Sequence, residues 1–139
     1  MEMPVYLFTG FLEAGKTKCI QETLEDSNFN TGEPLLVISC EEGVEELDPT
    51  SFASPNVAIE FVEEPGDLTT ELMEALEKKH NPKMIILEYN GMWMLDLFYS
   101  RMPEHWFVYQ VIISKKKLFY TKREPCLCWR ELVRVKQKF

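Results

Sequence analysis

Short apolar runs recur along this chain, and each run ends at a glycine, a turn or a polar residue. Runs of this length whose apolar residues are continuous, or alternate with other residues, are typical of β-strands buried on one or both faces. The pattern therefore predicts five strands, over residues 4–10, 35–40 and 57–63, within 81–91, and over 106–113.

Segments with helical spacing of their apolar residues lie between several of these runs. Residues 67–80 form the clearest predicted helix, because Asp67 or Thr69 can cap its N-terminus. Acidic residues fill its first turns and basic residues its last, an order that complements the helix dipole. Two further helices are predicted over residues 16–26 and 92–102.

Strands that alternate with helices favour a mostly parallel sheet with helices on both faces. At 139 residues the chain is long enough for one domain with a sizeable core. No apolar stretch approaches the roughly 20 residues of a membrane span. The start, "MEMPVYLFTG", has an acidic residue where a signal peptide carries positive charge. We therefore expect an α/β protein of the cytoplasm that does not contact membranes.

A phosphate-loop motif follows the first predicted strand. Residues 10–17, "GFLEAGKT", match the pattern G-x-x-x-x-G-K-[ST] without a mismatch. In such a loop, backbone N–H groups converge on the β-phosphate, and the following helix adds its positive N-terminal end. Lys16 would neutralise β- and γ-phosphate oxygens, and the Thr17 hydroxyl would ligate Mg²⁺. The predicted nucleotide-binding residues of the loop are Gly10, Glu13, Ala14, Gly15, Lys16, Thr17 and Lys18.

A chance turn between a strand and a helix is the alternative interpretation of this motif, and the surrounding pattern favours the nucleotide site. Such a site also needs an acidic residue at the end of a neighbouring strand, to orient the water shell of magnesium. Glu88 ends the apolar run "MIILE", and Gly91 follows it in an E-x-x-G spacing that would bring a backbone N–H to the γ-phosphate. We therefore predict Lys16 and Glu88 as catalytic residues, and Thr17 and Glu88 as residues of the magnesium site.

Together, "PVYLFTGFLEAGKT" and "IILEYNG" resemble the nucleotide-binding domain of the CobW/HypB/UreG group of P-loop GTPases. Members of this group carry a "TGFLGxGKT"-type loop and a Glu-x-x-Gly. The resemblance covers about residues 4–112. It implies a three-layer P-loop NTPase-like fold that is incomplete at its C-terminus. It also implies hydrolysis of GTP with Mg²⁺, coupled to metal delivery by a metal chaperone or to metallocofactor assembly on a client metalloprotein.

The chain departs from this family at the expected metal motif. Members usually carry Cys-x-Cys-Cys before the Glu-x-x-Gly, whereas this chain has only Cys40 there. Thiolate and carboxylate groups suit divalent ions, so Cys40 and the carboxylates after it would make a candidate zinc site. An acidic, solvated loop is the alternative. The carboxylates concerned are Glu41, Glu42, Glu45 and Asp48.

A second departure concerns the nucleotide base. GTPases of this kind read guanine with [NT]-K-x-D, and the nearest match, "SKKK" at 114–117, lacks the aspartate. GTP is the expected nucleotide from the resemblance, and the residues themselves leave ATP open. They also leave open whether the nucleotide is hydrolysed. The alternative is a nucleotide-binding or protein-interaction module without turnover.

Charge divides the chain near residue 114. Residues 1–113 carry 6 Lys and Arg against 21 Asp and Glu, while residues 114–139 carry 9 against 2. We expect a P-loop nucleotide-binding domain over 1–113 and a basic tail over 114–139. The tail contacts an acidic partner or the acidic body, or it is the product of a truncated or frameshifted gene. The net charge of −8 argues against nucleic-acid binding. The oligomeric state stays open.

Overall fold

Strands and helices alternate along the chain, as the sequence predicts. The computed structural model describes residues 2–10, 16–40, 47–114 and 132–133. Within these residues, five parallel strands and three α-helices form an α/β fold. The predicted α/β class with a mostly parallel sheet is therefore confirmed.

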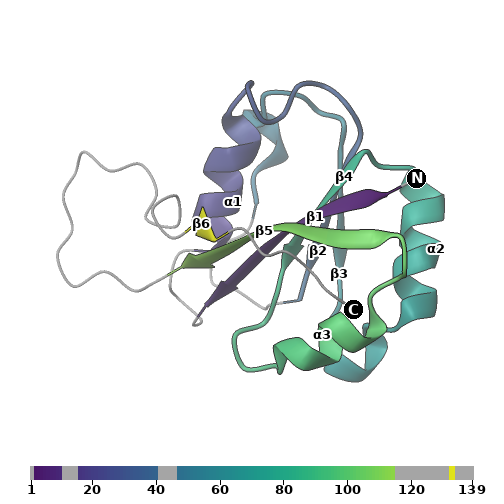
Figure 1. Cartoon of the computed structure of the whole chain (residues 1–139). Helices are drawn as coiled ribbons and strands as arrows, with labels where there is room; N and C mark the ends of the chain where they lie inside the picture. The colour runs from purple at the N-terminus through teal and green to yellow at the C-terminus, as the bar shows by residue number, and fades with distance from the viewer. Residues whose placement is uncertain (1, 11–15, 41–46, 115–131, 134–139) are drawn as a thin grey trace, which may run out of the picture.

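The sheet has the strand order β3-β2-β4-β1-β5-β6, in which β6 alone is antiparallel to its neighbour (Figure 1). β2 and β4 are almost entirely buried, because they occupy the inner part of the sheet and are covered on both faces. This burial explains why their sequences are continuous apolar runs. The strands are β1 (Met3–Gly10), β2 (Leu35–Ser39), β3 (Val57–Phe61), β4 (Met84–Glu88), β5 (Trp106–Ser114) and β6 (Leu132–Val133).

Helices cover both faces of the sheet (Figure 1). On one face, α1 (Lys16–Glu25) packs its apolar residues against side chains of β1, β2 and β4. On the other face, α2 (Thr70–His80) and α3 (Leu95–Arg101) form the larger hydrophobic cluster. Two short 3-10 helices, η1 (Pro49–Ser51) and η2 (Pro65–Asp67), lie in the connections. No helix in the described ranges is long and apolar enough to cross a membrane.

The start of α2 resolves a choice that the sequence left open. The Thr69 side chain accepts a hydrogen bond from the Leu72 N–H at 3.1 Å and caps the helix. Asp67 lies two residues earlier, as the last residue of η2. At the other end, Asn81 closes the helix in the left-handed conformation, with φ of 46°. The chain then enters β4 and reaches the carboxyl edge of the sheet at Glu88.

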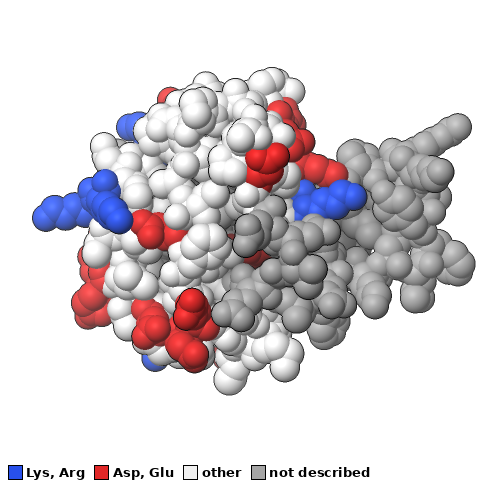
Figure 2. All heavy atoms as spheres, turned by 180° about the vertical axis from the view of Figure 1, so that it is seen from behind, with Lys and Arg blue, Asp and Glu red and all other residues white. Residues whose placement is uncertain are grey.

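The basic tail stays a prediction, because residues 115–131 and 134–139 lie outside the described ranges. Of the segment after 114, the structure describes Leu132 and Val133, whose backbone pairs with Ile112 and Val111 of β5. Figure 2 shows Asp and Glu side chains at several places on one face of the molecule, in keeping with the acidic excess of residues 1–113.

Candidate functional site

The predicted acidic residue, Glu88, lies at the carboxyl edge of the sheet and is only 3% exposed. It is the last residue of β4, and its register partners are Ser39 on β2 and Phe8 on β1. Side chains alternate between the two faces of a strand. Because Ile86 packs with α1, Glu88 also points to the face that α1 covers.

Two hydroxyl groups hold the Glu88 carboxylate. Thr17 Oγ1 donates to Oε2 at 2.6 Å, and Ser39 Oγ donates to Oε1 at 2.6 Å. An ionised carboxylate only accepts hydrogen bonds, so both hydroxyl protons point to it. Burying a charged group without partners is costly, and hydrogen bonds to an ionised acceptor are stronger than those between neutral groups. The hydrogen bonds from the two hydroxyls therefore offset part of the free-energy cost of burying this carboxylate.

The arrangement suits a hard cation. A hydroxyl has one proton and two lone pairs, so Thr17 can donate to Glu88 and still present oxygen lone pairs to a metal ion. Magnesium prefers oxygen ligands and is usually held by one or two protein oxygens together with water and substrate phosphates. Thr17 and Glu88 together fit this donor set, and both belong to the predicted magnesium site.

The loop residues are described only in part. Gly10 ends β1 and Lys16 begins α1, so the loop connects the carboxyl end of a strand to the N-terminus of a helix. Lys18 is exposed. The predicted contacts of Glu13, Ala14 and Gly15 lie outside the described residues.

Gly91 lies in an exposed turn directly after β4. In this turn the Met92 N–H donates to the Asn90 side chain at 2.8 Å, and the Trp93 N–H donates to the Asn90 carbonyl at 3.0 Å. Tyr89 anchors the turn from below, since its hydroxyl donates to the Met94 carbonyl at 2.5 Å. Burial raises the pKa of Tyr89 to about 12, with a further contribution from Cys40 beside it. The turn that contains Gly91 is thus held by hydrogen bonds directly after Glu88.

The zinc hypothesis receives no support from the residues that the structure describes. Cys40 is 2% exposed and packs in the cluster under α2 and α3. Asp48 lies at the start of η1 and bonds to Gln21 of α1, through its backbone N–H at 2.8 Å and its carbonyl at 3.0 Å. A hydrogen bond from the Thr50 hydroxyl is the main cause that lowers the pKa of Asp48.

Cys40 and Asp48 therefore pack with helices on different faces of the sheet. Across the described ranges, no group of three or more His, Cys, Asp or Glu side chains is arranged to hold a metal ion. Glu41, Glu42 and Glu45 lie outside these ranges, so the zinc site stays a prediction.

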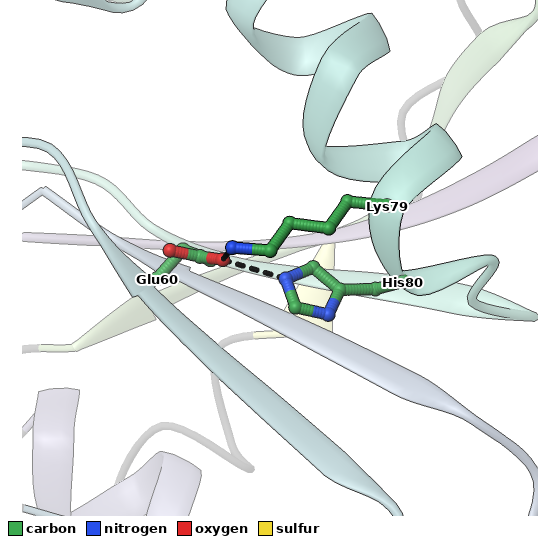
Figure 3. Close-up of polar contacts among 3 residues, drawn as sticks. All are labelled: Glu60, Lys79 and His80. Carbon is green, nitrogen blue, oxygen red and sulfur yellow. Dashed lines mark hydrogen bonds and ion pairs between the residues drawn. The ribbon is translucent and has the colours of Figure 1, made fainter.

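A second carboxylate, Glu60, has polar partners that link the sheet to a helix. Glu60 of β3 accepts hydrogen bonds from His80 Nε2 at 2.6 Å and Lys79 Nζ at 3.3 Å, and so joins the sheet to the end of α2 (Figure 3). The bond from His80 is the main cause that lowers the pKa of Glu60. Glu60 is the register partner of Ile38, which packs on the face of α2. It therefore lies on the opposite face from Glu88.

Sequence reasoning missed Ser39. It ends a continuous apolar run as a polar residue, and this is the signal that would have drawn attention to it. Its importance depends on the pairing of β2 with β4, which the order of residues along the chain does not reveal. Only this pairing puts Ser39 beside Glu88.

Compared with protein-family models, with curated proteins and with solved structures, this chain matches none of them. The resemblance to CobW-type GTPases therefore depends on the motif residues of the sequence alone and stays a prediction.

Proposed function

We propose that this chain binds a nucleoside triphosphate with Mg²⁺ at the carboxyl ends of β1 and β4. The observation that carries the proposal is the 2.6 Å hydrogen bond from Thr17 to Glu88. It joins the last residue of the phosphate-loop motif to the acidic residue of the E-x-x-G motif, 71 positions away in the chain. Two motifs recognised separately in the sequence thus meet at one point.

The strand before the loop and the helix after it also support phosphate binding. β1 ends at Gly10 and α1 starts at Lys16, so a phosphate held by the loop would meet the positive end of the α1 dipole. This strand–loop–helix unit belongs to the five parallel strands of the sheet, a layout that is compatible with the three-layer P-loop NTPase arrangement. The finer assignment to that fold is part of the proposal.

In the proposed reaction the protein acts by positioning and electrostatics, without a covalent intermediate. Thr17 donates its hydroxyl hydrogen bond to Glu88 and presents its oxygen lone pairs to the metal site. Lys16 neutralises charge on the β- and γ-phosphate oxygens. Thr17 and Glu88 would hold Mg²⁺ on this side of the site, and the ion would supply positive charge for transfer of the γ-phosphoryl group to water, with the nucleoside diphosphate as leaving group. Glu88 orients the ligands on the metal side, and Gly91 offers its backbone N–H to the γ-phosphate.

GTP is the nucleotide that the resemblance favours, and metal delivery or metallocofactor assembly is the associated role. A client metalloprotein in the cytoplasm would then be the partner. A binding module without turnover is the second candidate. The absence of an aspartate after "SKKK" favours it, because guanine would lose its characteristic carboxylate acceptor. ATP stays an alternative nucleotide for the same reason.

Titration of the full chain with labelled GTP and ATP, each with and without Mg²⁺, tests the proposal. Lys16→Ala should weaken Mg²⁺-nucleotide binding at least tenfold. Lys83→Ala is the matched control, because Lys83 is exposed and precedes β4 at the end opposite Glu88. This variant should bind Mg²⁺-nucleotide with the affinity of wild type. Equal affinities of wild type and Lys16→Ala would refute the phosphate-loop assignment. Release of phosphate at steady state then separates an enzyme from a binding module.

A further inference from the structure

We infer that Ser39 is a positioning residue of this site, whose hydroxyl holds the Glu88 carboxylate so that its second oxygen meets Thr17. The inference rests on the proposed function, because it concerns how the magnesium side of that site is kept in order. Ser39 belongs to neither sequence motif, and the strand pairing brings it to Glu88.

The orientation of the Glu88 carboxylate depends on its hydrogen-bond partners, Thr17 and Ser39. The last torsion of a glutamate side chain is broad, so its own rotamer preference sets the carboxylate plane only weakly. Across the sheet, one neighbour is the apolar Phe8 and the other is Ser39. Phe8 has no group that can donate to a carboxylate.

The two hydrogen bonds act on different oxygens of Glu88. Ser39 donates to Oε1 and Thr17 to Oε2, both at 2.6 Å. The two oxygens belong to one rigid carboxylate group, so its rotation would break both bonds together. The bond from Ser39 to Oε1 therefore also fixes the position of Oε2, which accepts from Thr17. When the Thr17 oxygen faces a metal ion, the bond from Ser39 keeps the carboxylate in place.

The backbone around Ser39 is held independently of its hydroxyl. The Ser39 carbonyl accepts from the Val62 N–H at 2.8 Å, and the Cys40 N–H donates to the Glu88 carbonyl at 2.8 Å. Ser39 itself is 5% exposed, at the end of a buried strand. Removal of the hydroxyl should therefore leave the strand in position and change mainly the carboxylate.

A purely structural role and a positioning role give different results. If Ser39 only satisfies a buried oxygen, its loss lowers stability and leaves the magnesium dependence of nucleotide binding unchanged. If it positions Glu88, the magnesium dependence changes, while nucleotide binding without magnesium does not. Partners of metal ligands typically contribute 10–100-fold to metal affinity.

The experiment titrates Mg²⁺ into the full chain with labelled GTP as the probe, and repeats GTP binding in EDTA. Ser39→Ala should raise the Mg²⁺ concentration for half-maximal binding about tenfold, with GTP affinity in EDTA unchanged. Ser39→Thr, which keeps the hydroxyl, should restore the wild-type dependence. The Ser39→Cys side chain is a weaker donor, so this variant should need a Mg²⁺ concentration between those of wild type and Ser39→Ala. If Ser39→Ala does not fold, Ser39→Cys replaces it in the test, with the same outcomes.

Thr23→Val is the matched control. The Thr23 hydroxyl is buried and donates to the Cys19 carbonyl at 2.8 Å within α1, away from Glu88. The Thr23→Val variant should need the same Mg²⁺ concentration for half-maximal GTP binding as wild type. The inference is overturned if Ser39→Ala matches wild type, or if Thr23→Val shifts the magnesium dependence as much as Ser39→Ala.

The same titration separates this inference from the proposed function. A wild-type chain that binds no nucleotide, or binds it without regard to magnesium, overturns both. A wild-type chain with magnesium-dependent binding that Thr17→Val abolishes, while Ser39→Ala leaves it intact, overturns the role of Ser39 alone.

Discussion

Replacing Thr17 by valine removes the hydroxyl that donates to Glu88 and keeps the size and β-branch of the side chain. The Glu88 carboxylate, only 3% exposed, then loses one of the two hydroxyl donors that hold it. Leaving a buried acceptor without its partner costs about 1–3 kcal/mol. Thr17 is only partly buried, so water can replace some of the loss. We expect the free energy of unfolding to fall by about 1.5 kcal/mol.

Urea unfolding without nucleotide measures this change. With a slope m of about 2 kcal/mol/M, the midpoint should fall by about 0.8 M at unchanged slope. Thr23→Val makes the same substitution in the same helix, but removes a hydroxyl that donates to a carbonyl four residues earlier. Such bonds contribute little to helix stability, so this control should lose less than about 1 kcal/mol.

A double-mutant cycle isolates the bond itself. Glu88→Leu alone should destabilise the protein, while the double variant with Thr17→Val should lose less than the sum of the two single variants. Replacing both partners by apolar groups is often nearly neutral, so we expect a coupling energy of about 1–2 kcal/mol. A coupling below about 0.5 kcal/mol, or a Thr17→Val variant as stable as Thr23→Val, would refute the Thr17–Glu88 bond and the site built on it.

Three further predictions concern residues around the site and the helix that supports the sheet. Partners lower the pKa of Glu60 below its ordinary value of 4.5, so its contribution to stability is complete above that pH and is lost as the pH falls through the folded pKa. The stability difference between wild type and Glu60→Gln should therefore shrink in acid denaturation curves below pH 4.5, and a constant difference would contradict the bond from His80. Burial raises the pKa of Tyr89 to about 12 from 10.0, so its contribution to stability is lost as the pH rises through that interval. Tyr89→Phe should show a weaker loss of stability over this interval in alkaline unfolding, and the same loss as wild type would count against the burial. Asn81→Ala should lower the thermal midpoint, because alanine disfavours the left-handed conformation at φ of 46° by about 1 kcal/mol, while Asn81→Gly should not; equal midpoints for both variants would contradict the cap.

The proposed site was partly readable from sequence because its chemistry depends on local motifs. The spacing in "GFLEAGKT" and the position of Glu88 at the end of "MIILE" mark Thr17 and Glu88 without knowledge of the fold. The structure brings these two side chains within 2.6 Å of each other. The predicted zinc site stays a prediction: Cys40 and Asp48 pack with helices on different faces of the sheet, and Glu41, Glu42 and Glu45 lie outside the described residues.

By itself, the sequence determined the type and approximate bounds of the main elements, because apolar periodicity and end signals act over a few residues. The run at 35–40 became β2, and 67–80 contained α2. Only the tertiary structure decided the strand order β3-β2-β4-β1-β5, since pairing joins residues far apart in the chain. That order puts Ser39 beside Glu88 and Phe8 on its other side. The sequence therefore marked Thr17 but not Ser39, the second hydroxyl partner of the buried carboxylate.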